Sequence, residues 1–123
     1  PSFAPPPGAF ARVRLQEALN YISTELHKGF SPLFRANCPE EWKAVVRENL
    51  HRNFALVDAT LAKQPYFTGE TFTVADGYLF TVLGWTRYVN LDLSGYPNIG
   101  AFLARVAQRP AVNAALVAEG LKR

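Results

Sequence analysis

The segment from residue 73 to residue 85 constrains the fold of this chain more than any other. Thr73 and Asp76 are three positions apart, which is the spacing of an N-cap hydroxyl and a carboxylate that each bond the other's backbone N–H group. Residues 78–85, which follow, are apolar on nearly every side of a helix. Such a helix must be covered by other elements all round, so it is expected at the centre of a domain.

Amphipathic segments elsewhere predict the helices that cover this central one. The first of them carries apolar residues at the spacing i, i+4, i+7 and i+11, which is one stripe of a helix. These residues are Leu15, Leu19, Ile22 and Leu26. Gly29, Ser31 and Pro32 come next and are expected to break or kink the helix.

Prolines mark the ends of the other helices. One helix is expected to begin after Pro39 and to end before Pro65, another begins at Pro97, and the last begins at Pro110. Gly120 is at the position of a C-terminal cap glycine. The residues expected to face the core are Trp42, Val45, Val46, Leu50, Phe54, Val57 and Leu61, then Ile99, Phe102, Leu103 and Val106, and finally Val112, Leu116 and Val117.

No segment alternates between apolar and polar residues as a half-buried strand would. The sequence therefore predicts an all-α fold, an irregular helical bundle of about five helices around a central apolar helix. Residues 1–8 contain four of the nine prolines and are expected to form an interdomain linker. Residues 9–123 are expected to form the helical domain, since 123 residues suffice for one hydrophobic core.

Composition and charge exclude several classes of function. Cys38 is the only cysteine, which rules out an internal disulfide or a multi-cysteine metal site. His27 and His51 are far apart in sequence, so no metal site is expected. The net charge of +3 is spread over scattered basic residues interleaved with acids, which is typical of a solvated surface and not of a nucleic-acid binder. No signal peptide or membrane span is expected, and the predicted location is cytoplasmic.

One strip of polar side chains is a candidate binding site. Asn20, Thr24 and His27 share a helix face at i, i+4 and i+7, with Glu25 and Lys28 beside it. These groups could bind a small, anionic, peptide-like ligand in a groove or at a domain interface. The alternative is a solvated helix edge whose terminal lysine complements the helix dipole. The pattern alone favours the solvated edge.

Two further residues have both a structural and a functional interpretation. Trp85, near the end of the central helix, could line a cleft, but a tryptophan in the core is the commoner case. Asp76 could be a buried catalytic carboxylate, but a helix cap is the better interpretation, because it satisfies backbone N–H groups at the helix start. Thr73 and Asp76 are therefore predicted to form a structural cap.

Three segments of the chain carry a resemblance to a known family: residues 19–34, which contain the run Glu-Leu-His-Lys, residues 66–85 with the Thr-Val-Ala-Asp cap, and residues 96–121. In these segments the chain resembles the C-terminal domain of beta-class bacterial glutathione transferases. The resemblance covers nearly the whole chain from Phe10 onward. One departure is Gly77, where relatives commonly carry a branched apolar residue that staples the cap to the residue before it, here Phe72.

The resemblance implies a function for the polar strip. Asn20, Thr24, Glu25 and His27 match positions that line or reach the glutathione site, some of them across a dimer interface. Lys28 and Trp85 match positions that flank the cleft where glutathione and a hydrophobic co-substrate meet. In the family a thioredoxin-like domain precedes the linker and supplies most of the glutathione site, including the cysteine characteristic of the class; that domain is expected to be absent from this chain. Cys38 does not occupy the position of that cysteine.

The expected function of the parent protein is the attack of the glutathione thiolate on electrophilic hydrophobic substrates, by a homodimer. Glutathione is then a co-substrate, and no cofactor is expected. No catalytic residue is predicted within this chain, so the isolated domain is expected to be inactive. The alternative is a non-catalytic interaction module, since helical domains of this type also occur as assembly units in translation proteins. A small DNA-binding protein is a third and weaker hypothesis, which rests only on the basic pI.

Overall fold

The structure, a computed structural model, describes residue 4, residue 8 and residues 10–112. In that part of the chain the predicted all-α fold is confirmed. The only β-type pairing there is an isolated bridge between Tyr66 and Gly69. The elements are α1 (Phe10–Tyr21), the π-helical turn η1 (Ile22–His27), α2 (Lys28–Phe30), the 3₁₀ turn η2 (Ser31–Phe34), α3 (Glu40–Lys63), α4 (Val74–Gly84), the 3₁₀ turn η3 (Trp85–Tyr88) and α5 (Pro97–Ala107).

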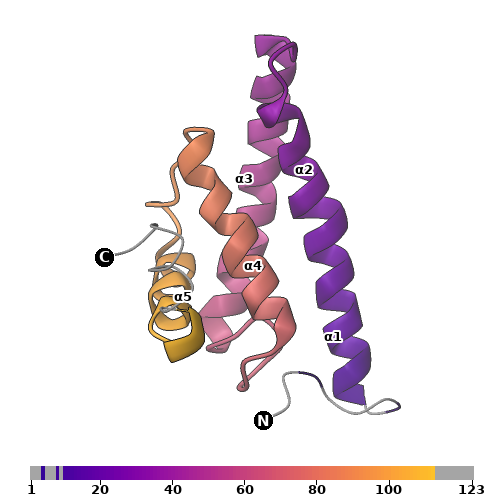
Figure 1. Cartoon of the computed structure of the whole chain (residues 1–123), viewed down its shortest axis with the longest axis vertical. Coiled ribbons are helices and arrows are strands. Elements are labelled where there is room, and N and C mark those ends of the chain that lie inside the picture. The colour runs from indigo at the N-terminus through magenta and orange to yellow at the C-terminus, as the bar shows by residue number, and fades with distance from the viewer. Residues whose placement is uncertain (1–3, 5–7, 9, 113–123) are drawn as a thin grey trace.

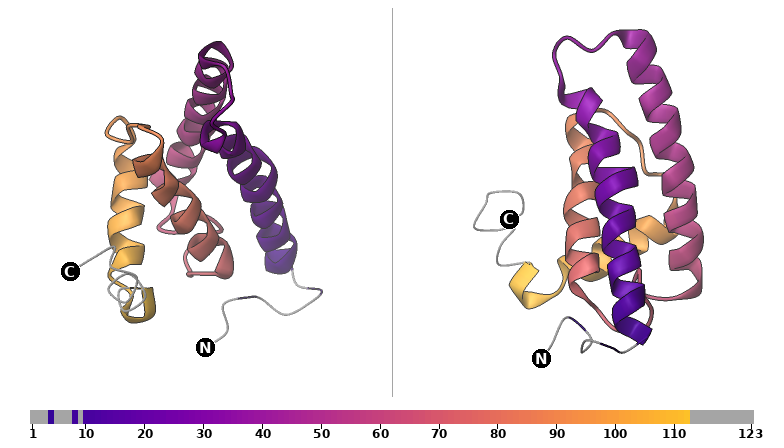
Figure 2. Two further views of the ribbon diagram at one scale, coloured as in Figure 1. Left: turned by 45° about the horizontal axis from the view of Figure 1, so that its top comes forward. Right: turned by 90° about the vertical axis from the view of Figure 1, so that its right-hand side faces the viewer.

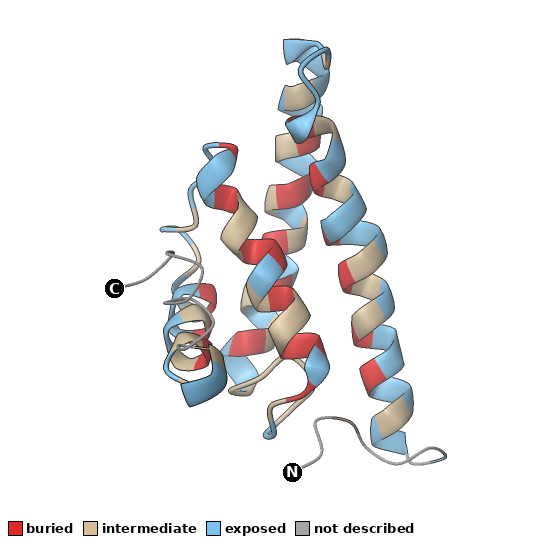
Figure 3. Cartoon of the chain, in the orientation of Figure 1, coloured by how far each residue is buried: buried red, intermediate tan, exposed pale blue. Residues whose placement is uncertain are grey.

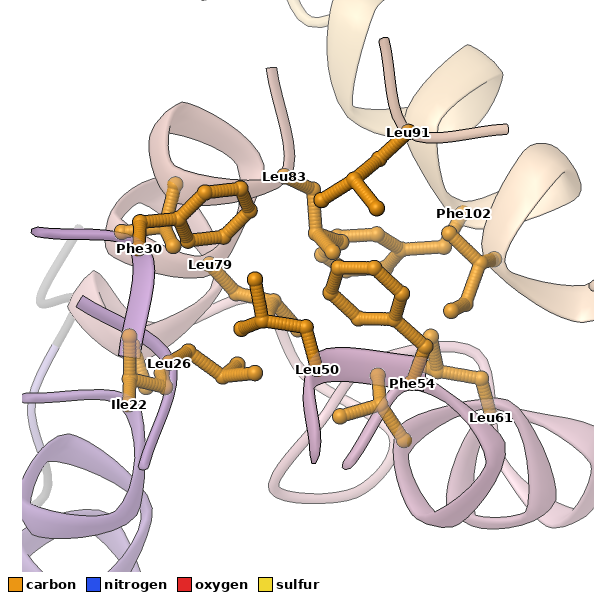
Figure 4. Packing of buried hydrophobic residues seen from close by; sticks show 14 of the residues in the cluster. Ile22, Leu26, Phe30, Leu50, Phe54, Leu61, Leu79, Leu83, Leu91 and Phe102 are labelled. Carbon is orange, nitrogen blue, oxygen red and sulfur yellow. The ribbon is translucent and has the colours of Figure 1, made fainter. Parts of the chain in front are cut away.

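The predicted central helix is α4. It lies between the long helical rod of residues 10–34 on one side and α5 on the other, with α3 behind it (Figure 1; Figure 2). Leu79, Val82 and Leu83 of α4 are fully buried. Figure 4 shows Leu79 and Leu83 surrounded by side chains from these helices and from the loop before α5, which holds Leu91: Ile22, Leu26, Phe30, Leu50, Phe54, Leu91 and Phe102.

The predicted break of the first rod is found at Ser31 and Pro32, and not at Gly29. Helical turns continue through α2 and only tighten to 3₁₀ geometry at Ser31–Phe34, where Pro32 occupies the first turn. Gly29 instead permits a close approach to α3. A Cβ atom at this position would lie 3.2 Å from Cδ2 of Leu50, which is itself almost completely buried.

The π-helical turn adjusts which face of the rod is buried. The buried residues of the rod include Ala18, Ile22, Leu26 and Phe30, so three successive intervals are of four residues. An α-helix of 3.6 residues per turn would carry these positions progressively around its surface. The wider π turn, with its i→i+5 bonding, keeps them facing the core. Leu19, predicted to be in the stripe, is only half-buried.

The predicted stripe of α3 is right along most of the helix and wrong at its start. Val46, Leu50, Phe54, Val57 and Leu61 are buried, whereas Trp42 is 53% and Val45 42% exposed. The reason is the length of α3. Its first turns extend past the end of α4, so α4 does not cover them there (Figure 3).

The start of α4 has the capping box that the sequence predicts. The N–H of Ala75 donates to Oγ1 of Thr73 at 3.3 Å, and the N–H of Thr73 donates to Oδ2 of Asp76 at 2.8 Å. Asp76 is completely buried, and that burial raises the pKa of its carboxyl above the ordinary value. Hydrogen bonds from Phe67 and Thr73 and the charge of Arg109 oppose the rise in this pKa.

The last described part of the chain contains α5 and the start of one further predicted helix. In α5, Ile99, Phe102 and Val106 are buried as predicted, while Leu103 is half-buried. Residues 110–112 are helical, in agreement with a helix starting at Pro110. The rest of that predicted helix, with Leu116, Val117 and Gly120, lies outside the described residues, as does most of the predicted linker.

Candidate functional site

The polar strip of the first rod meets the central helix at His27. Nδ1 of His27 lies 2.6 Å from the hydroxyl oxygen of Tyr78, which is on α4. The imidazole also packs edge-on against Trp85, with 4.9 Å between ring centroids and 84° between ring planes. His27 is the last residue of the π-helical turn, a feature that often marks functional sites because it redirects side chains locally.

Two open cavities lie on either side of the His27–Tyr78 pair. The cavity nearer the start of the rod, called the polar cavity below, has a volume of about 520 Å³ and is lined by Gln16, Leu19, Asn20, Ser23 and Tyr78. The other, called the aromatic cavity, has a volume of about 420 Å³ and is lined by His27, Phe30, Ser31, Phe34, Trp85 and Tyr88. The first offers amide and hydroxyl groups, and the second offers mainly ring surfaces.

Trp85 forms the floor of the aromatic cavity. Its ring contacts Phe30 edge-on at a centroid distance of 5.7 Å and Phe34 at 6.1 Å. Trp85 is therefore both part of the packed interior and part of a cavity wall, so the two interpretations of this residue do not exclude each other. Phe34 and Tyr88 are 52% and 60% exposed at the rim, which leaves apolar surface open to a ligand.

Three of the six predicted site residues lie at these cavities, and three do not. Asn20 lines the polar cavity, and His27 and Trp85 line the aromatic one. Thr24 is exposed and lines neither cavity, and its hydroxyl donates to the carbonyl of Asn20 at 2.8 Å. Lys28 is also exposed and lines neither cavity.

Glu25 is exposed and lies near Tyr21, a residue whose hydroxyl contacts α3. It is close enough to Tyr21 that its negative charge, added to the larger effect of burial, raises the pKa of that phenol to about 12. The hydroxyl of Tyr21 in turn donates to Oδ1 of Asn53 on α3, at 3.0 Å. Glu25 therefore lies beside Tyr21 and at neither cavity.

Sequence reasoning missed several residues that line the cavities: Gln16, Ser23, Ser31, Phe34, Tyr78 and Tyr88. Ser23, His27 and Ser31 recur every four residues, a spacing that matches the π-helical turn and could have indicated a shared face. Tyr78 lies inside the apolar run of α4 and looked like core. Nothing in its local sequence indicates that its hydroxyl reaches His27.

The rest of the described chain was also compared with the predicted sites. A third cavity, of about 640 Å³, lies between the start of α1 and the end of α3 and is lined by none of the predicted site residues. Cys38 is half-buried in the loop before α3 and lines none of these cavities. Within residues 10–112 no cluster of three or more His, Cys, Asp or Glu side chains could hold a metal ion. No helix in the described part of the chain is long and apolar enough to cross a membrane.

These features define an all-α domain in which a central capped helix and a long first rod enclose paired polar and aromatic cavities. Residues 40–105 match the family described as "Glutathione S-transferase, C-terminal domain". Because the match covers more than half of the chain, the chain belongs to the family of glutathione S-transferase C-terminal domains.

Individual glutathione transferases are similar to this chain in sequence and in fold. The chain is 50% identical to the glutathione S-transferase GstA of Escherichia coli O157:H7 over 117 residues, which are 95% of this chain and 58% of that protein. Its fold matches BphK, a bacterial glutathione transferase solved as a ternary complex, with a TM-score of 0.93 and 51% identity over 97% of this chain and 60% of that one.

Two further solved structures extend the comparison. A sphingomonad glutathione S-transferase complexed with glutathione is 44% identical, with a TM-score of 0.91. The bacterial beta-class enzyme of Sphingomonas chungbukensis is 42% identical, with a TM-score of 0.91. Each match covers 97% of this chain and 59% of the other. The resemblance to the beta class is thus confirmed, and the chain spans less than two thirds of the length of these relatives.

Proposed function

We propose that this chain is the C-terminal domain of a glutathione transferase whose parent protein conjugates the glutathione thiolate to electrophilic hydrophobic substrates. The observation that supports this best is the pair of adjoining cavities that share the His27–Tyr78 contact. A tripeptide needs polar partners such as the amide of Asn20 and the hydroxyl of Ser23. An apolar electrophile needs ring surfaces such as that of Trp85.

The proposed roles of the two domains follow from the cavities and from the resemblance. The cavities can hold two reactants side by side, which favours reaction by proximity and orientation. The resemblance assigns activation of the thiol to another domain. In the proposal, a thioredoxin-like domain of the parent protein, joined through residues 1–8 as a linker, stabilises the thiolate. Glutathione is then a co-substrate, and the parent protein is a cytoplasmic homodimer.

Thr24, Glu25 and Lys28 keep their proposed roles through the resemblance. All three are exposed, and they lie outside both cavities. Exposed side chains can reach glutathione held by another domain or by a second subunit. In the proposal, Lys28 attracts a glutathione carboxylate, and Thr24 and Glu25 act across the dimer interface. A non-catalytic interaction module is less favoured, since such a module has no need of a polar cavity beside an aromatic one.

The test uses the parent protein and three variants assayed with glutathione and a chlorinated aromatic electrophile. His27→Ala and Lys28→Ala are expected to raise the KM for glutathione several-fold, because each removes a polar contact to the bound peptide. Lys63→Ala is the matched control, since it removes a similar charge at the end of α3. Unchanged kinetics in both His27→Ala and Lys28→Ala would remove these residues from the site. Absence of conjugation by the parent protein would refute the proposed activity.

The isolated chain offers a simpler test of binding. It contains two tryptophans, Trp42 and Trp85, and Trp42 lies outside both cavities. In a Trp42→Phe background, the fluorescence of Trp85 therefore reports on the aromatic cavity. Saturable quenching by an S-alkyl glutathione is expected, with turnover near the uncatalysed rate. Robust turnover by these 123 residues would contradict the assignment of thiol activation to another domain.

A further inference from the structure

We propose that Tyr78 is a positioning residue. Its phenol donates a hydrogen bond to Nδ1 of His27, which keeps the imidazole proton on Nε2 and presents an N–H donor at the junction of the polar and aromatic cavities. The contact that carries this inference is the 2.6 Å distance between Nδ1 and the phenol oxygen. The inference that this N–H group bonds a substrate rests on the proposed function. The inference that the proton is on Nε2 does not.

The direction of this hydrogen bond follows from the partners available. Among the described residues, the hydroxyl of Tyr78 has one hydrogen-bonding contact, the imidazole of His27. A neutral imidazole has one nitrogen that accepts and one that donates. The phenol is the more acidic of the two possible donors, and an imidazole nitrogen is a better acceptor than a phenol oxygen. The phenol proton therefore lies between the two residues, and Nδ1 carries none.

The second histidine of the chain shows the opposite arrangement. Nδ1 of His51 lies 2.8 Å from the hydroxyl of Tyr96, but that hydroxyl also lies 3.2 Å from the backbone carbonyl of His51. A carbonyl can only accept, so the proton of Tyr96 is directed to it. Nδ1 of His51 must then donate to the phenol oxygen. The two His–Tyr pairs thus predict opposite tautomers, with the proton on Nε2 in His27 and on Nδ1 in His51.

The surroundings of His27 hold the imidazole in this orientation. The ring is packed edge-on against Trp85 and also edge-on against Tyr78, at centroid distances of 4.9 and 5.8 Å. Tyr78 is on α4, one turn after the cap, and is half-buried against the core. Because the two nitrogens of an imidazole point in nearly opposite directions, Nε2 faces away from the phenol. His27 lines the aromatic cavity, so an anionic oxygen or sulfur atom held there would meet an N–H donor.

The test is ¹⁵N NMR of the histidine side chains in the full 123-residue chain, at a pH where both imidazoles are neutral. The chain has two histidines, so the spectrum contains two imidazole patterns, and a His27→Gln variant assigns them. The expected result is a proton on Nε2 in one ring and on Nδ1 in the other. A His27 pattern with the proton on Nδ1 would overturn the proposal, without the need for any variant at Tyr78.

Tyr78→Phe tests the cause of the tautomer. This variant keeps the ring and removes only the hydroxyl, so His27 is expected to shift to a mixture of tautomers while His51 stays unchanged. Tyr66→Phe is the matched control. It removes a phenol hydroxyl from the connector between α3 and α4, and it leaves both His–Tyr pairs intact. An unchanged His27 spectrum in Tyr78→Phe would show that Tyr78 does not set the proton position.

Binding measurements separate this inference from the proposed function. Tyr78→Phe in the parent protein is expected to bind glutathione several-fold more weakly, with Tyr66→Phe unchanged. If the wild-type protein does not bind glutathione but the NMR pattern is as expected, the proposed function fails and the positioning role stands. If glutathione binds but His27 carries its proton on Nδ1, only the positioning role fails.

Discussion

Asp76 accepts the backbone N–H of Phe67 at 2.7 Å, nine residues earlier in the chain. The same carboxylate accepts the N–H of Thr73 through its other oxygen, at 2.8 Å. One side chain therefore closes the start of α4 and also holds the connector that leads from α3. The cap is a tertiary contact as well as a local one, which increases the expected cost of removing it.

Asp76→Ala is expected to lower the free energy of unfolding by about 2–4 kcal/mol, because the buried N–H of Thr73 and the partly buried N–H of Phe67 lose their acceptor. This exceeds the roughly 1–2 kcal/mol that a local cap alone would cost. Asp76→Asn, which keeps one acceptor oxygen, should fall in between. Urea unfolding of the chain measures all three. A loss as small as that of an exposed cap would show that the Phe67 contact contributes little. Ligand affinity is expected to be unchanged, since Asp76 lines neither cavity.

Asp58 on α3 caps α5 from a distant part of the chain. Its Oδ1 accepts the N–H groups of Asn98 and Ile99, each at 2.9 Å. We expect Asp58→Ala to destabilise the fold by about 1–3 kcal/mol, since these are hydrogen bonds to a charged acceptor. Asp92→Ala is the control, because Asp92 is exposed and bonds only the nearby Ser94. Equal losses in the two variants, in the same urea experiment, would contradict the cap.

Alanine substitutions at two helical glycines are expected to change the stability of the fold in opposite directions. At Gly77 a new Cβ would lie 4.0 Å from Phe72, an ordinary contact, so Gly77→Ala should stabilise by about 0.5–1 kcal/mol. At Gly29 it would lie 3.2 Å from the buried Leu50, so overpacking of about 1–3 kcal/mol should exceed the gain in helix propensity. Thermal unfolding should therefore show shifts of opposite sign. A stabilising Gly29→Ala would mean that Leu50 can move.

Tyr21 should make the fold sensitive to alkaline pH. Burial, and secondarily the charge of Glu25, raises the pKa of its phenol from 10.0 to about 12. Because the folded state prefers the protonated phenol, this stability is fully present below pH 10 and is lost as the pH rises through about 12. Tyr21→Phe loses the bond to Asn53 but should unfold with a weaker pH dependence in that window.

The absorbance of tyrosinate checks this directly. The chain has five tyrosines, and the latest-titrating step is expected to disappear in Tyr21→Phe. Burial, and secondarily the charge of Asp58, also raises the pKa of Tyr96, so the step of Tyr96 should remain in Tyr21→Phe. Tyr66→Phe is the matched control and should keep the step near pH 12. Survival of that step in Tyr21→Phe would assign it to another phenol.

Local features of the fold were predictable, and distant ones were not. The box of Thr73 and Asp76 spans three residues, so its pattern is complete in the sequence. The close approach of Gly29 to Leu50 was missed, because Leu50 is on another helix. Trp42 was misassigned to the core for a related reason. Apolar periodicity indicates a face of a helix, but it does not indicate how far along the helix its neighbours extend.

Part of the candidate site was also predictable from the sequence, and part was not. Asn20, His27 and Trp85 were predicted, and they line the two cavities. Glu25 was expected beside the polar strip and received its site role from the resemblance, whereas in the structure it lies near Tyr21 and lines neither cavity. Tyr78 could not be chosen from its own segment, since its partner is 51 residues away.

The sequence by itself determined the fold class, the order of the helices, the cap of the central helix and the resemblance to a family. All of these follow from interactions within a few residues or from patterns along one helix. Only the tertiary structure decided which polar groups meet: Tyr78 with His27, Asp58 with the start of α5, and Asp76 with Phe67. Hydrogen bonds are short and directional, so partners far apart in sequence are selected only when packing brings the helices together.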